Sequence, residues 1–265
     1  MNADFIIPFL MDSEDRLRNL FRAVIYLSNS FPNNKIYIIN QTYLSNDGHI
    51  YQYIDEYKLH HNVIVHSVDI PMPCYKTKLI NIGINLVQKN SVIMYDCDVL
   101  IPKEQLELSV ELCDKGYALV YPYSNPQYNV NQYQFSEFQN NYDFVELQKI
   151  IEPYQIPHLH QKFRYPIIGY SPGFCLTLNK RELGNHIYYN EEFRSPQFED
   201  AEYIFKMDFL KMKMTRVYGP VFHFQHERVV EVKYPDIIQN NKRIYENIMS
   251  MNSEQLTNYY IKEHK

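Results

Sequence analysis

The feature that most constrains the fold is an alternation of continuous apolar segments with segments of helical periodicity over the first 123 residues. Strands are predicted at 4–10, 35–41, 62–69 and 117–123 and in the run that starts at Val92; helices are predicted after a cap at Asp12 or Ser13, at 49–59, at 76–90 and at 103–116, the last stopped by Gly116. Strands that alternate with helices form a mostly parallel sheet covered on both faces. Ligands of such sheets bind beyond the carboxyl ends of the strands. We therefore expect an α/β fold with a ligand crevice at that edge.

Composition limits the partners and the compartment. A chain of 265 residues fits one large α/β domain, and a net charge of −5 argues against a nucleic-acid partner, because binders of phosphate backbones carry a basic excess. No run approaches about 18 apolar residues and no leader is recognisable, so we expect a cytoplasmic protein without a transmembrane segment. The four cysteines are scattered without metal-ligand spacing, so we expect buried thiols and no disulfides.

The stretch VIMYDCDVLIP, residues 92–102, ends an apolar strand on two carboxylates, Asp96 and Asp98. Their spacing points both side chains to one side if the strand continues that far. Two carboxylates this close raise each other's pKa unless a cation neutralises them, and a divalent metal with a preference for oxygen does so best. The pair therefore indicates part of a metal site; the alternative is a solvated loop at the end of a strand.

Four blocks of sequence resemble one family of enzymes. The segment CYKTKLINIGINLVQKNSVIMYDCDVLIPKEQ resembles the donor-binding segment of the β-1,4-galactosyltransferase family and of capsule-type family 2 glycosyltransferases, in which a basic helix precedes a strand carrying Asp-x-Asp. DFIIPFLMDSEDRLRNL resembles the opening strand and helix of the capsule-type enzymes, GFCLTLNKREL…EEFRSPQFEDAEYIFKM their acceptor segment, and VYGPVFHFQHER their metal-binding stretch. The resemblance implies the GT-A fold, a UDP-sugar donor and a divalent metal.

The resemblance implies which residues hold the metal. Asp98 is the first-choice ligand, and Asp96 holds the ribose or reaches the metal indirectly. His223 and His226 complete the ligand set; the alternative is a surface histidine pair in a loop. Residues three apart on a regular strand face opposite sides, so one ion binds both histidines only if the chain turns at 224–225. Mixed oxygen and imidazole ligands suit Mn²⁺ better than Mg²⁺.

The donor contacts that the resemblance implies lie at the start of the chain. Pro8 and Phe9 end the first strand, where the family places its nucleotide-binding loop, and Lys76 occupies the position of a basic residue near the nucleotide. Ordinary core packing by Phe9 and a solvated helix start at Lys76 are the alternatives. The family usually has an arginine soon after Pro-Phe, and this chain has Leu10 there, so Arg16 is the candidate substitute.

A second acidic pair, Glu199 and Asp200, opens a segment of helical periodicity. Acidic residues are common in the first turn of a helix, because the helix dipole stabilises them by about 0.3–1 kcal/mol. In the resembling family this pair faces the acceptor sugar. An inverting transfer needs a base opposite the leaving phosphate. Asp200 is thus the predicted general base, with Glu199 positioning the acceptor, although the segment before them lacks the family's glycine- and tryptophan-rich loop.

The rest of the chain is expected to belong to the same domain. Residues 124–166 form an insertion with a helix around 142–151; its His-x-His at 158–160 is expected to be structural. The tail is expected to form two helices that pack back on the domain, with peripheral membrane contact as the weaker interpretation. We expect a single domain over 1–265, with a nucleotide-sugar half at 1–123, an acceptor half with the metal-binding stretch at 124–234, and C-terminal helices at 235–265.

The resemblance therefore implies an inverting, metal-dependent glycosyltransferase, whereas the residue spacing alone indicates only an acidic metal site. The enzyme would move a hexose or N-acetylhexosamine from a UDP-sugar to a hydroxyl of a glycan or glycolipid, in the synthesis of a surface polysaccharide. Two alternatives stay open: a degenerate protein of the same fold that binds glycans or acts as a scaffold, and a magnesium-dependent nucleotidyltransferase or phosphohydrolase that uses the two aspartates.

Overall fold

The computed structural model describes residues 1–42, 48–71, 75–130, 144, 148, 153–154, 173–227 and 233–262. Most of the predicted insertion, with its helix around 142–151 and the histidines at 158 and 160, lies outside the described residues, as does Cys74. The other three cysteines are buried free thiols, as the sequence predicted. Within the described ranges, no helix has both the length and the apolar character that a bilayer crossing requires.

The strands form two sheets within the described part of the chain. The larger sheet has the order β10-β6-β9-β4-β1-β2-β3 and consists of β1 (Ala3–Leu10), β2 (Ile36–Gln41), β3 (Val63–Val68), β4 (Ser91–Tyr95), β6 (Leu119–Tyr121), β9 (Cys175–Asn179) and β10 (Met214–Arg216). The smaller sheet has the order β5-β11-β7-β8 and consists of β5 (Val99–Leu100), β7 (Gln127–Val130), β8 (Pro153–Tyr154) and β11 (Val221–Phe224). In the larger sheet only β9 runs antiparallel to its neighbours, β4 and β6, so the predicted mostly parallel sheet is confirmed.

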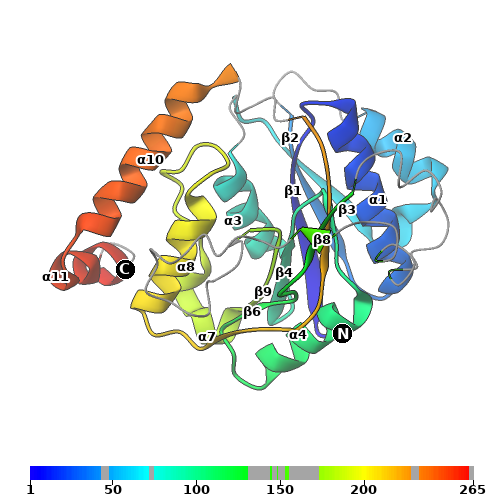
Figure 1. Cartoon of the computed structure of the whole chain (residues 1–265). Helices are drawn as coiled ribbons and strands as arrows, with labels where there is room; N and C mark the ends of the chain where they lie inside the picture. The colour runs from blue at the N-terminus through cyan, green and yellow to red at the C-terminus, as the bar shows by residue number, and fades with distance from the viewer. Residues whose placement is uncertain are drawn as a thin grey trace.

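Helices cover both faces of the larger sheet, with α1 and α2 on one side of β1 and α3 and α8 on the other (Figure 1). The helices are α1 (Glu14–Ser30), α2 (Gly48–Glu56), α3 (Lys76–Leu86), α4 (Lys103–Asp114), α7 (Lys180–Leu183), α8 (Glu199–Phe209), α10 (Pro235–Ser250) and α11 (Ser253–Thr257), with short 3-10 or π-helical turns η1 (Leu59–His61), η4 (Gly184–Ile187) and η5 (Asn258–Lys262). Each helix that was predicted in the first 123 residues is present.

Local chemistry explains where these elements begin and end. Ser13 caps α1, because its hydroxyl accepts a hydrogen bond from the Arg16 backbone N–H at 3.3 Å. Gly116, just after α4, has a φ of +88°, a left-handed conformation that glycine adopts without steric cost. Gly83 lets α3 lie close to the sheet, since a Cβ at this position would come within 2.9 Å of Ile6.

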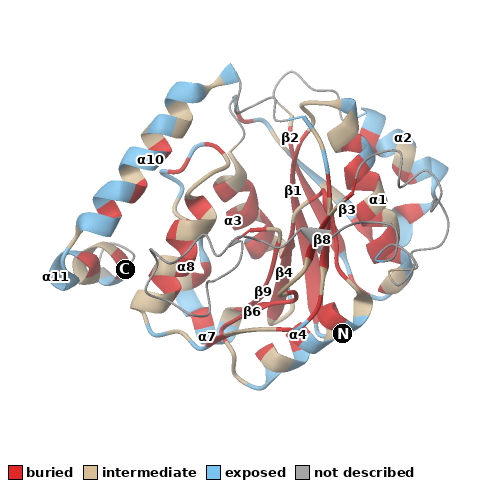
Figure 2. Cartoon of the chain, in the orientation of Figure 1, coloured by how far each residue is buried: buried red, intermediate tan, exposed pale blue. Residues whose placement is uncertain are grey.

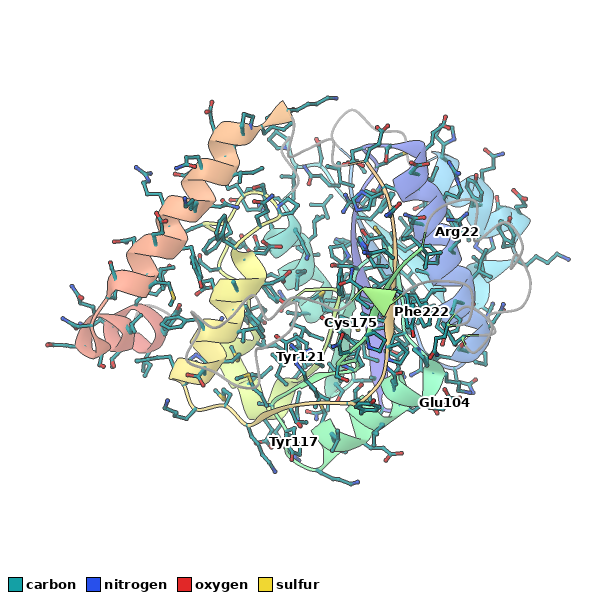
Figure 3. The ribbon with its side chains drawn as sticks, viewed as in Figure 1. Arg22, Glu104, Tyr117, Tyr121, Cys175 and Phe222 are labelled. Atoms are coloured by element: carbon teal, nitrogen blue, oxygen red, sulfur yellow. The ribbon has the colours of Figure 1, made fainter. Side chains whose placement is uncertain are left out.

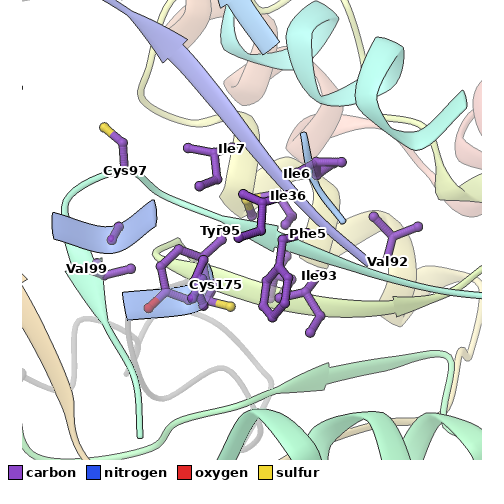
Figure 4. Packing of buried hydrophobic residues seen from close by; sticks show 14 of the residues in the cluster. Phe5, Ile6, Ile7, Ile36, Val92, Ile93, Tyr95, Cys97, Val99 and Cys175 are labelled. Carbon is purple, nitrogen blue, oxygen red and sulfur yellow. The ribbon is translucent and has the colours of Figure 1, made fainter. Parts of the chain in front are cut away.

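The main core lies between the larger sheet and its helices, and Figure 2 shows it as a continuous buried region along the strands. All eight residues of β1 are buried, which explains why residues 5–10 form a continuous apolar run rather than an alternating one. The charged exception in this strand, Asp4, forms an ion pair with Lys89 at 2.8 Å. In Figure 4, Phe5 of β1 packs with Ile93 and Tyr95 of β4 and with Cys175 of β9. Burial on both faces therefore produced the continuous apolar runs that the sequence displayed.

The C-terminal helices pack against α8 and not against the sheet (Figure 1). A second apolar cluster lies between α8 and the C-terminal helices. Its buried members are Phe193, Tyr245, Ile248, Leu256 and Tyr260. The prediction of two C-terminal helices that pack back on the fold is therefore confirmed, and α8 has one face in each cluster.

Candidate functional site

Asp98 lies in a short connection between the two sheets. β4 ends at Tyr95, so Asp96 and Asp98 do not continue the strand and do not share one of its faces. The Tyr95 hydroxyl accepts a hydrogen bond from the Ile101 N–H at 3.1 Å, which fixes the turn between them. Asp98 is 6% exposed. The two aspartates therefore serve two neighbouring groups of side chains.

The smaller sheet brings the two histidines to Asp98. β5 pairs antiparallel with β11, with His223 opposite Val99, and the Phe224 N–H donates to the Asp98 carbonyl at 2.8 Å. β11 ends at Phe224, after which the chain turns and His226 approaches the same carboxylate. The turn at 224–225 that a shared ion requires is therefore present.

The three side chains form a compact ligand set. Nε2 of His226 lies 2.8 Å from Oδ2 of Asp98, and Nε2 of His223 lies 4.0 Å from the same oxygen. One ligand atom from each residue lies within 4.8 Å of the others. With metal–ligand bonds of about 2.1 Å, neighbouring ligand atoms are about 3–4 Å apart, so the 2.8 and 4.0 Å separations of the two histidines from Asp98 are close to those around one ion.

The other nitrogen of each ring faces a hydrogen-bond acceptor. Nδ1 of His226 lies 2.7 Å from the Glu227 carbonyl oxygen, and Nδ1 of His223 lies 3.4 Å from Oδ1 of Asn129. An Nδ1–H that donates to these oxygens leaves the Nε2 lone pairs facing Asp98. A lone pair and a carboxylate repel each other unless a proton or a metal ion lies between them. The donor set is therefore suited to a cation.

The electrostatics of Asp98 agree with this geometry. Burial alone would raise the pKa of Asp98, but the hydrogen bond from His226 and the charges of His223 and Arg16 lower it well below its usual range. The same hydrogen bond raises the pKa of His226, which burial opposes.

Lys76, at the start of α3, contacts three acidic side chains. Its Nζ lies 3.3 Å from Oδ1 of Asp96, 3.4 Å from Oε1 of Glu199 and 3.1 Å from Oδ2 of Asp200. Burial would lower the pKa of Lys76, but the charges of Asp200, Asp96 and Glu199 raise it well above its usual value. The Lys76 ammonium therefore stays charged and joins Asp96 to the start of α8.

Glu199 and Asp200 begin α8, as predicted, after two residues with positive φ, Gln197 and Phe198. Burial, followed by the charge of Asp200, raises the pKa of Glu199 to about 8. Oδ1 of Asp200 and Oε2 of Glu199 are buried and have no hydrogen-bond partner within the described part of the chain. Gly173 allows Asp200 to approach, since a Cβ there would lie 2.9 Å from Oδ2.

The other predicted donor residues lie at the start of the chain. Pro8 and Phe9 are buried in β1, and Phe9 is part of the main core, which agrees with the packing alternative. Arg16 forms an ion pair with Asp12 at 3.7 Å, and its charge helps to lower the pKa of Asp98. Arg16 therefore lies near the predicted metal ligands. Its role in donor binding stays a prediction.

Two positioning residues were not predicted from the sequence. Asn129, on β7, lies opposite His223 in the parallel pairing of β7 with β11. Asn241, on α10, is fully buried and binds the segment before α8. Its side chain accepts a hydrogen bond from the Arg194 N–H and donates to the carbonyls of Ser195 and Gln197 at 3.0 and 3.2 Å. No pattern in the neighbouring sequence marks either residue as a positioning residue, because each contacts a segment that is distant in the sequence.

Beneath this site, the end of the larger sheet is closed by aromatic side chains. Tyr121 and Cys175, labelled in Figure 3, lie in the interior at the middle of the molecule. The Arg216 guanidinium lies 3.7 Å from the centre of the Tyr121 ring, and burial, opposed by this charge, raises the pKa of Tyr121 above its usual value. Tyr121 and Arg216 therefore pack together beside the buried end of the sheet.

Comparison with solved structures identifies the fold. The chain is similar to S. aureus TarS 1–349, with a TM-score of 0.59 and 13% identity over 97% of this chain and 68% of that chain. It is also similar to the mannosyltransferase PcManGT from Pyrobaculum calidifontis in complex with GDP-Man and Mn²⁺, with a TM-score of 0.57 and 12% identity over 98% of this chain and 68% of that chain. TarS 1–349 in complex with UDP matches with a TM-score of 0.56 and 13% identity, over 99% of this chain and 70% of that chain.

No protein-family model matches the sequence, and no curated protein matches it either. At identities of 12–13% the structural likeness shows the fold alone. The GT-A fold that the sequence resemblance implied is therefore confirmed.

Proposed function

We propose that this chain is an inverting, metal-dependent glycosyltransferase that moves a hexose or N-acetylhexosamine from a UDP-sugar to a hydroxyl of a glycan or glycolipid. The single observation that carries the proposal is the meeting of Asp98, His223 and His226 beside the Lys76 cluster. Asp96 links the two groups, because it contacts Lys76 and its pKa is affected by Asp98. A metal site and a base therefore belong to one crevice.

Asp98, His223 and His226 would hold the divalent cation. Mn²⁺ suits two imidazoles and one carboxylate better than Mg²⁺. A bound metal supplies a Lewis acid for the diphosphate whose negative charge grows as the glycosidic bond breaks. The Nδ1 contacts to Asn129 and the Glu227 carbonyl keep both rings oriented for this role.

Asp200 is the proposed general base. Its Oδ2 lies 3.1 Å from Nζ of Lys76, and its Oδ1 is the oxygen left to accept the proton of the acceptor hydroxyl. The acceptor oxygen then bonds to the anomeric carbon from the face opposite the departing diphosphate, and the proton stays on Asp200. Glu199, with a pKa of about 8, carries a proton at neutral pH and can donate a hydrogen bond to the acceptor.

Residues 1–123 would bind the donor and 124–234 the acceptor, as halves of one domain, with 235–265 as supporting helices. On the donor side, Asp96 would hold the ribose, and Pro8, Phe9, Arg16 and Lys76 would surround the nucleotide. The presence of UDP in one structural neighbour, and of GDP-Man and Mn²⁺ in another, supports a nucleotide-sugar donor. We place the reaction in the cytoplasm, in the synthesis of a surface polysaccharide.

The test is a thermal-shift screen of UDP- and GDP-sugars with Mn²⁺, followed by an assay of nucleotide release from the best binder. Ligand binding stabilises the fold in proportion to affinity, so the donor should stand out. Asp98→Asn should weaken Mn²⁺ binding and donor binding together by at least about tenfold. Even the loss of a residue that only hydrogen-bonds to a metal ligand lowers metal affinity by this factor. Asp114→Asn, the same change on the exposed end of α4, is the matched control.

If Asp98→Asn bound Mn²⁺ and the donor as tightly as the unmodified chain, the proposed metal site would be wrong. Retained glycan binding without any turnover would instead favour the scaffold alternative.

A further inference from the structure

Phe174 directly precedes β9 and contacts groups of the proposed site, although the proposed function gives it no role. Cys175, the next residue, begins β9 and is labelled near the middle of the molecule in Figure 3. Cys175 pairs with Tyr95 of β4, so Phe174 lies beside the end of β4, where Asp96 follows. The Asp96 N–H donates to the Phe174 carbonyl at 2.8 Å. The backbone of Phe174 therefore holds an aspartate just beyond the end of its strand.

The backbone of Phe174 is in the left-handed region, with a φ of +72°. Bulky residues rarely adopt this conformation, because the side chain then comes too close to the backbone. Phe174 is one of five residues other than glycine with a positive φ in the described part of the chain, and two more, Gln197 and Phe198, directly precede Glu199. Such conformations persist where the surroundings hold them, and they gather at functional sites. The position therefore calls for contacts that explain why a phenylalanine, and not a glycine, occupies it.

The Phe174 ring packs against the ring of His223, one of the proposed metal ligands. The two ring centroids are 5.1 Å apart, and the ring planes are inclined by 34°. On the side of the core, the centroid of the Tyr123 ring lies 5.9 Å away, and Phe174 is partly buried against the main cluster. The ring of Phe174 therefore contacts both the rigid core and the imidazole.

The His223 imidazole depends on such a contact more than the His226 imidazole does. Nδ1 of His226 lies 2.7 Å from the Glu227 carbonyl oxygen, a short hydrogen bond. Nδ1 of His223 lies 3.4 Å from Oδ1 of Asn129, beyond the usual range of about 2.7–3.2 Å. A metal ligand has to keep its lone pair directed at the ion, and neighbouring side chains fix that direction. A ring packed on the imidazole adds what the long hydrogen bond to Asn129 does not supply.

The residue before Phe174 approaches the third group of the site. The Tyr123 hydroxyl donates to the Gly173 carbonyl, which fixes this residue to the core. A Cβ on Gly173 would lie 2.9 Å from Oδ2 of Asp200, so the backbone passes close to the proposed base. Residues 173 and 174 are thus in contact with a metal-side histidine, with Asp96 and with the start of α8.

We propose that Phe174 is a positioning residue of the metal site, whose ring holds the His223 imidazole in the orientation that a bound cation requires. This inference rests on the proposed function, since it takes His223 as a metal ligand. The phenylalanine side chain has no donor or acceptor atom, so its effect passes through His223. Glycine would adopt the same backbone without steric cost, but it would remove the ring from the imidazole.

Three substitutions separate the ring from the backbone. Phe174→Tyr keeps the ring, Phe174→Leu removes it, and Phe174→Gly removes both the ring and the steric cost of the positive φ. Electron paramagnetic resonance measures Mn²⁺ binding to the full chain without nucleotide, and the binding counted is the part that Asp98→Asn loses. Phe174→Leu and Phe174→Gly should each weaken it about two- to tenfold, the range of one aromatic contact, and Phe174→Tyr should stay within about twofold of the unmodified chain.

The matched control is Phe209→Leu, the same change in the second apolar cluster, where the Phe209 ring contacts Tyr260. Urea denaturation without metal measures the stability of every variant. Phe209→Leu and Phe174→Leu should both unfold at lower urea concentrations, but only Phe174→Leu should bind Mn²⁺ more weakly. Phe174→Gly has no steric cost at this φ, so it provides a folded protein for the measurement even if Phe174→Leu does not.

Three results would overturn the inference, and they differ in what else they remove. If Phe174→Leu and Phe174→Gly bind Mn²⁺ as the unmodified chain does, the ring has no positioning role, while the proposed metal site stands. If Phe209→Leu weakens Mn²⁺ binding equally, metal affinity only follows stability. If the unmodified chain binds no Mn²⁺, the proposed metal site is wrong and this inference is wrong with it.

Discussion

At the scale of single residues, the site depends on one ammonium group that faces three carboxyl groups. Lys76 contacts Oδ2 of Asp200 and leaves its Oδ1 available. We predict that Asp200→Asn lowers the rate of sugar transfer at least about 100-fold, the usual contribution of a general base, because an amide cannot accept the proton. The donor Kd, measured by calorimetry, should change less than about twofold. Asp208→Asn, on the same helix, is the control, and unchanged transfer by Asp200→Asn would remove Asp200 as the base.

The buried Glu199 predicts a dependence of stability on pH. Its pKa is raised to about 8 by burial and by Asp200, so between pH 4.5 and 8 the folded chain holds a proton that the unfolded chain has lost. This contribution to stability is complete below the unfolded pKa and is lost as pH rises through the folded pKa. One such proton is worth about 1.36 kcal/mol per pH unit.

Urea unfolding at pH 5 and pH 8 measures this effect. The unmodified chain should lose at least about 1 kcal/mol more over this interval than Glu199→Gln, which has no proton to release. Equal losses in the two proteins would mean that Glu199 is ionised throughout.

The sequence predicted these residue types but not their grouping. Asp96 and Asp98 were predicted to share one side only if the strand continued that far; the strand ends at Tyr95, and the two side chains face different partners. The ion pairs of Lys76 with Glu199 and Asp200 join residues more than 120 positions apart, and no local pattern reports such pairs. A resemblance across several blocks suggested that they share a site, whereas only the fold supplied the contacts.

At the scale of elements, the segment before α8 is held by α10. The Asn241 side-chain oxygen accepts a hydrogen bond from one backbone N–H of this segment, and its side-chain nitrogen donates to two backbone carbonyls of the segment. We predict that Asn241→Ala lowers the free energy of unfolding by about 1–3 kcal/mol, because the Ser195 and Gln197 carbonyls lose their partner. Transfer should fall more than donor binding does, since the segment leads into Glu199.

The matched control is Asn247→Ala, an exposed position on the same helix, which should change stability by less than about 0.5 kcal/mol. Urea denaturation of the two variants, with donor titrations and transfer rates, makes the comparison. Equal effects of both substitutions would show that Asn241 has no special role in positioning α8.

Helices and strands with a strong hydrophobic pattern could be predicted from the sequence, and short strands could not. Strands β1 and β2 contain continuous apolar runs at 5–10 and 36–39, and α1 and α4 have clear periodicity and end signals, so local rules located them. β5, with two residues, owes its existence to its pairing with β11, and this pairing places Asp98 beside His223. The part of the fold that builds the proposed metal site was therefore the part that sequence periodicity could not supply.

At the scale of the whole molecule, α8 connects two cores of unequal size. One face of α8 contributes Tyr203, Ile204 and Met207 to the main core, and its other side packs on the C-terminal cluster. Cooperative units with fewer buried contacts open at lower free energy. We therefore expect hydrogen exchange to be slowest in β1, β2 and β4 and faster in α10, α11 and η5.

One hydroxyl tests this arrangement. Tyr260→Phe leaves both oxygens of the fully buried Glu202 without a hydrogen-bond partner among the described residues, at a cost of about 1–3 kcal/mol. Because this bond crosses between α8 and η5, the variant should exchange faster in α11 and η5 while β1 and β4 keep their protection. Hydrogen exchange followed by mass spectrometry measures both regions in one experiment. Faster exchange throughout the sheet would mean that the two clusters unfold as one unit, since the central strands then open whenever the C-terminal helices do.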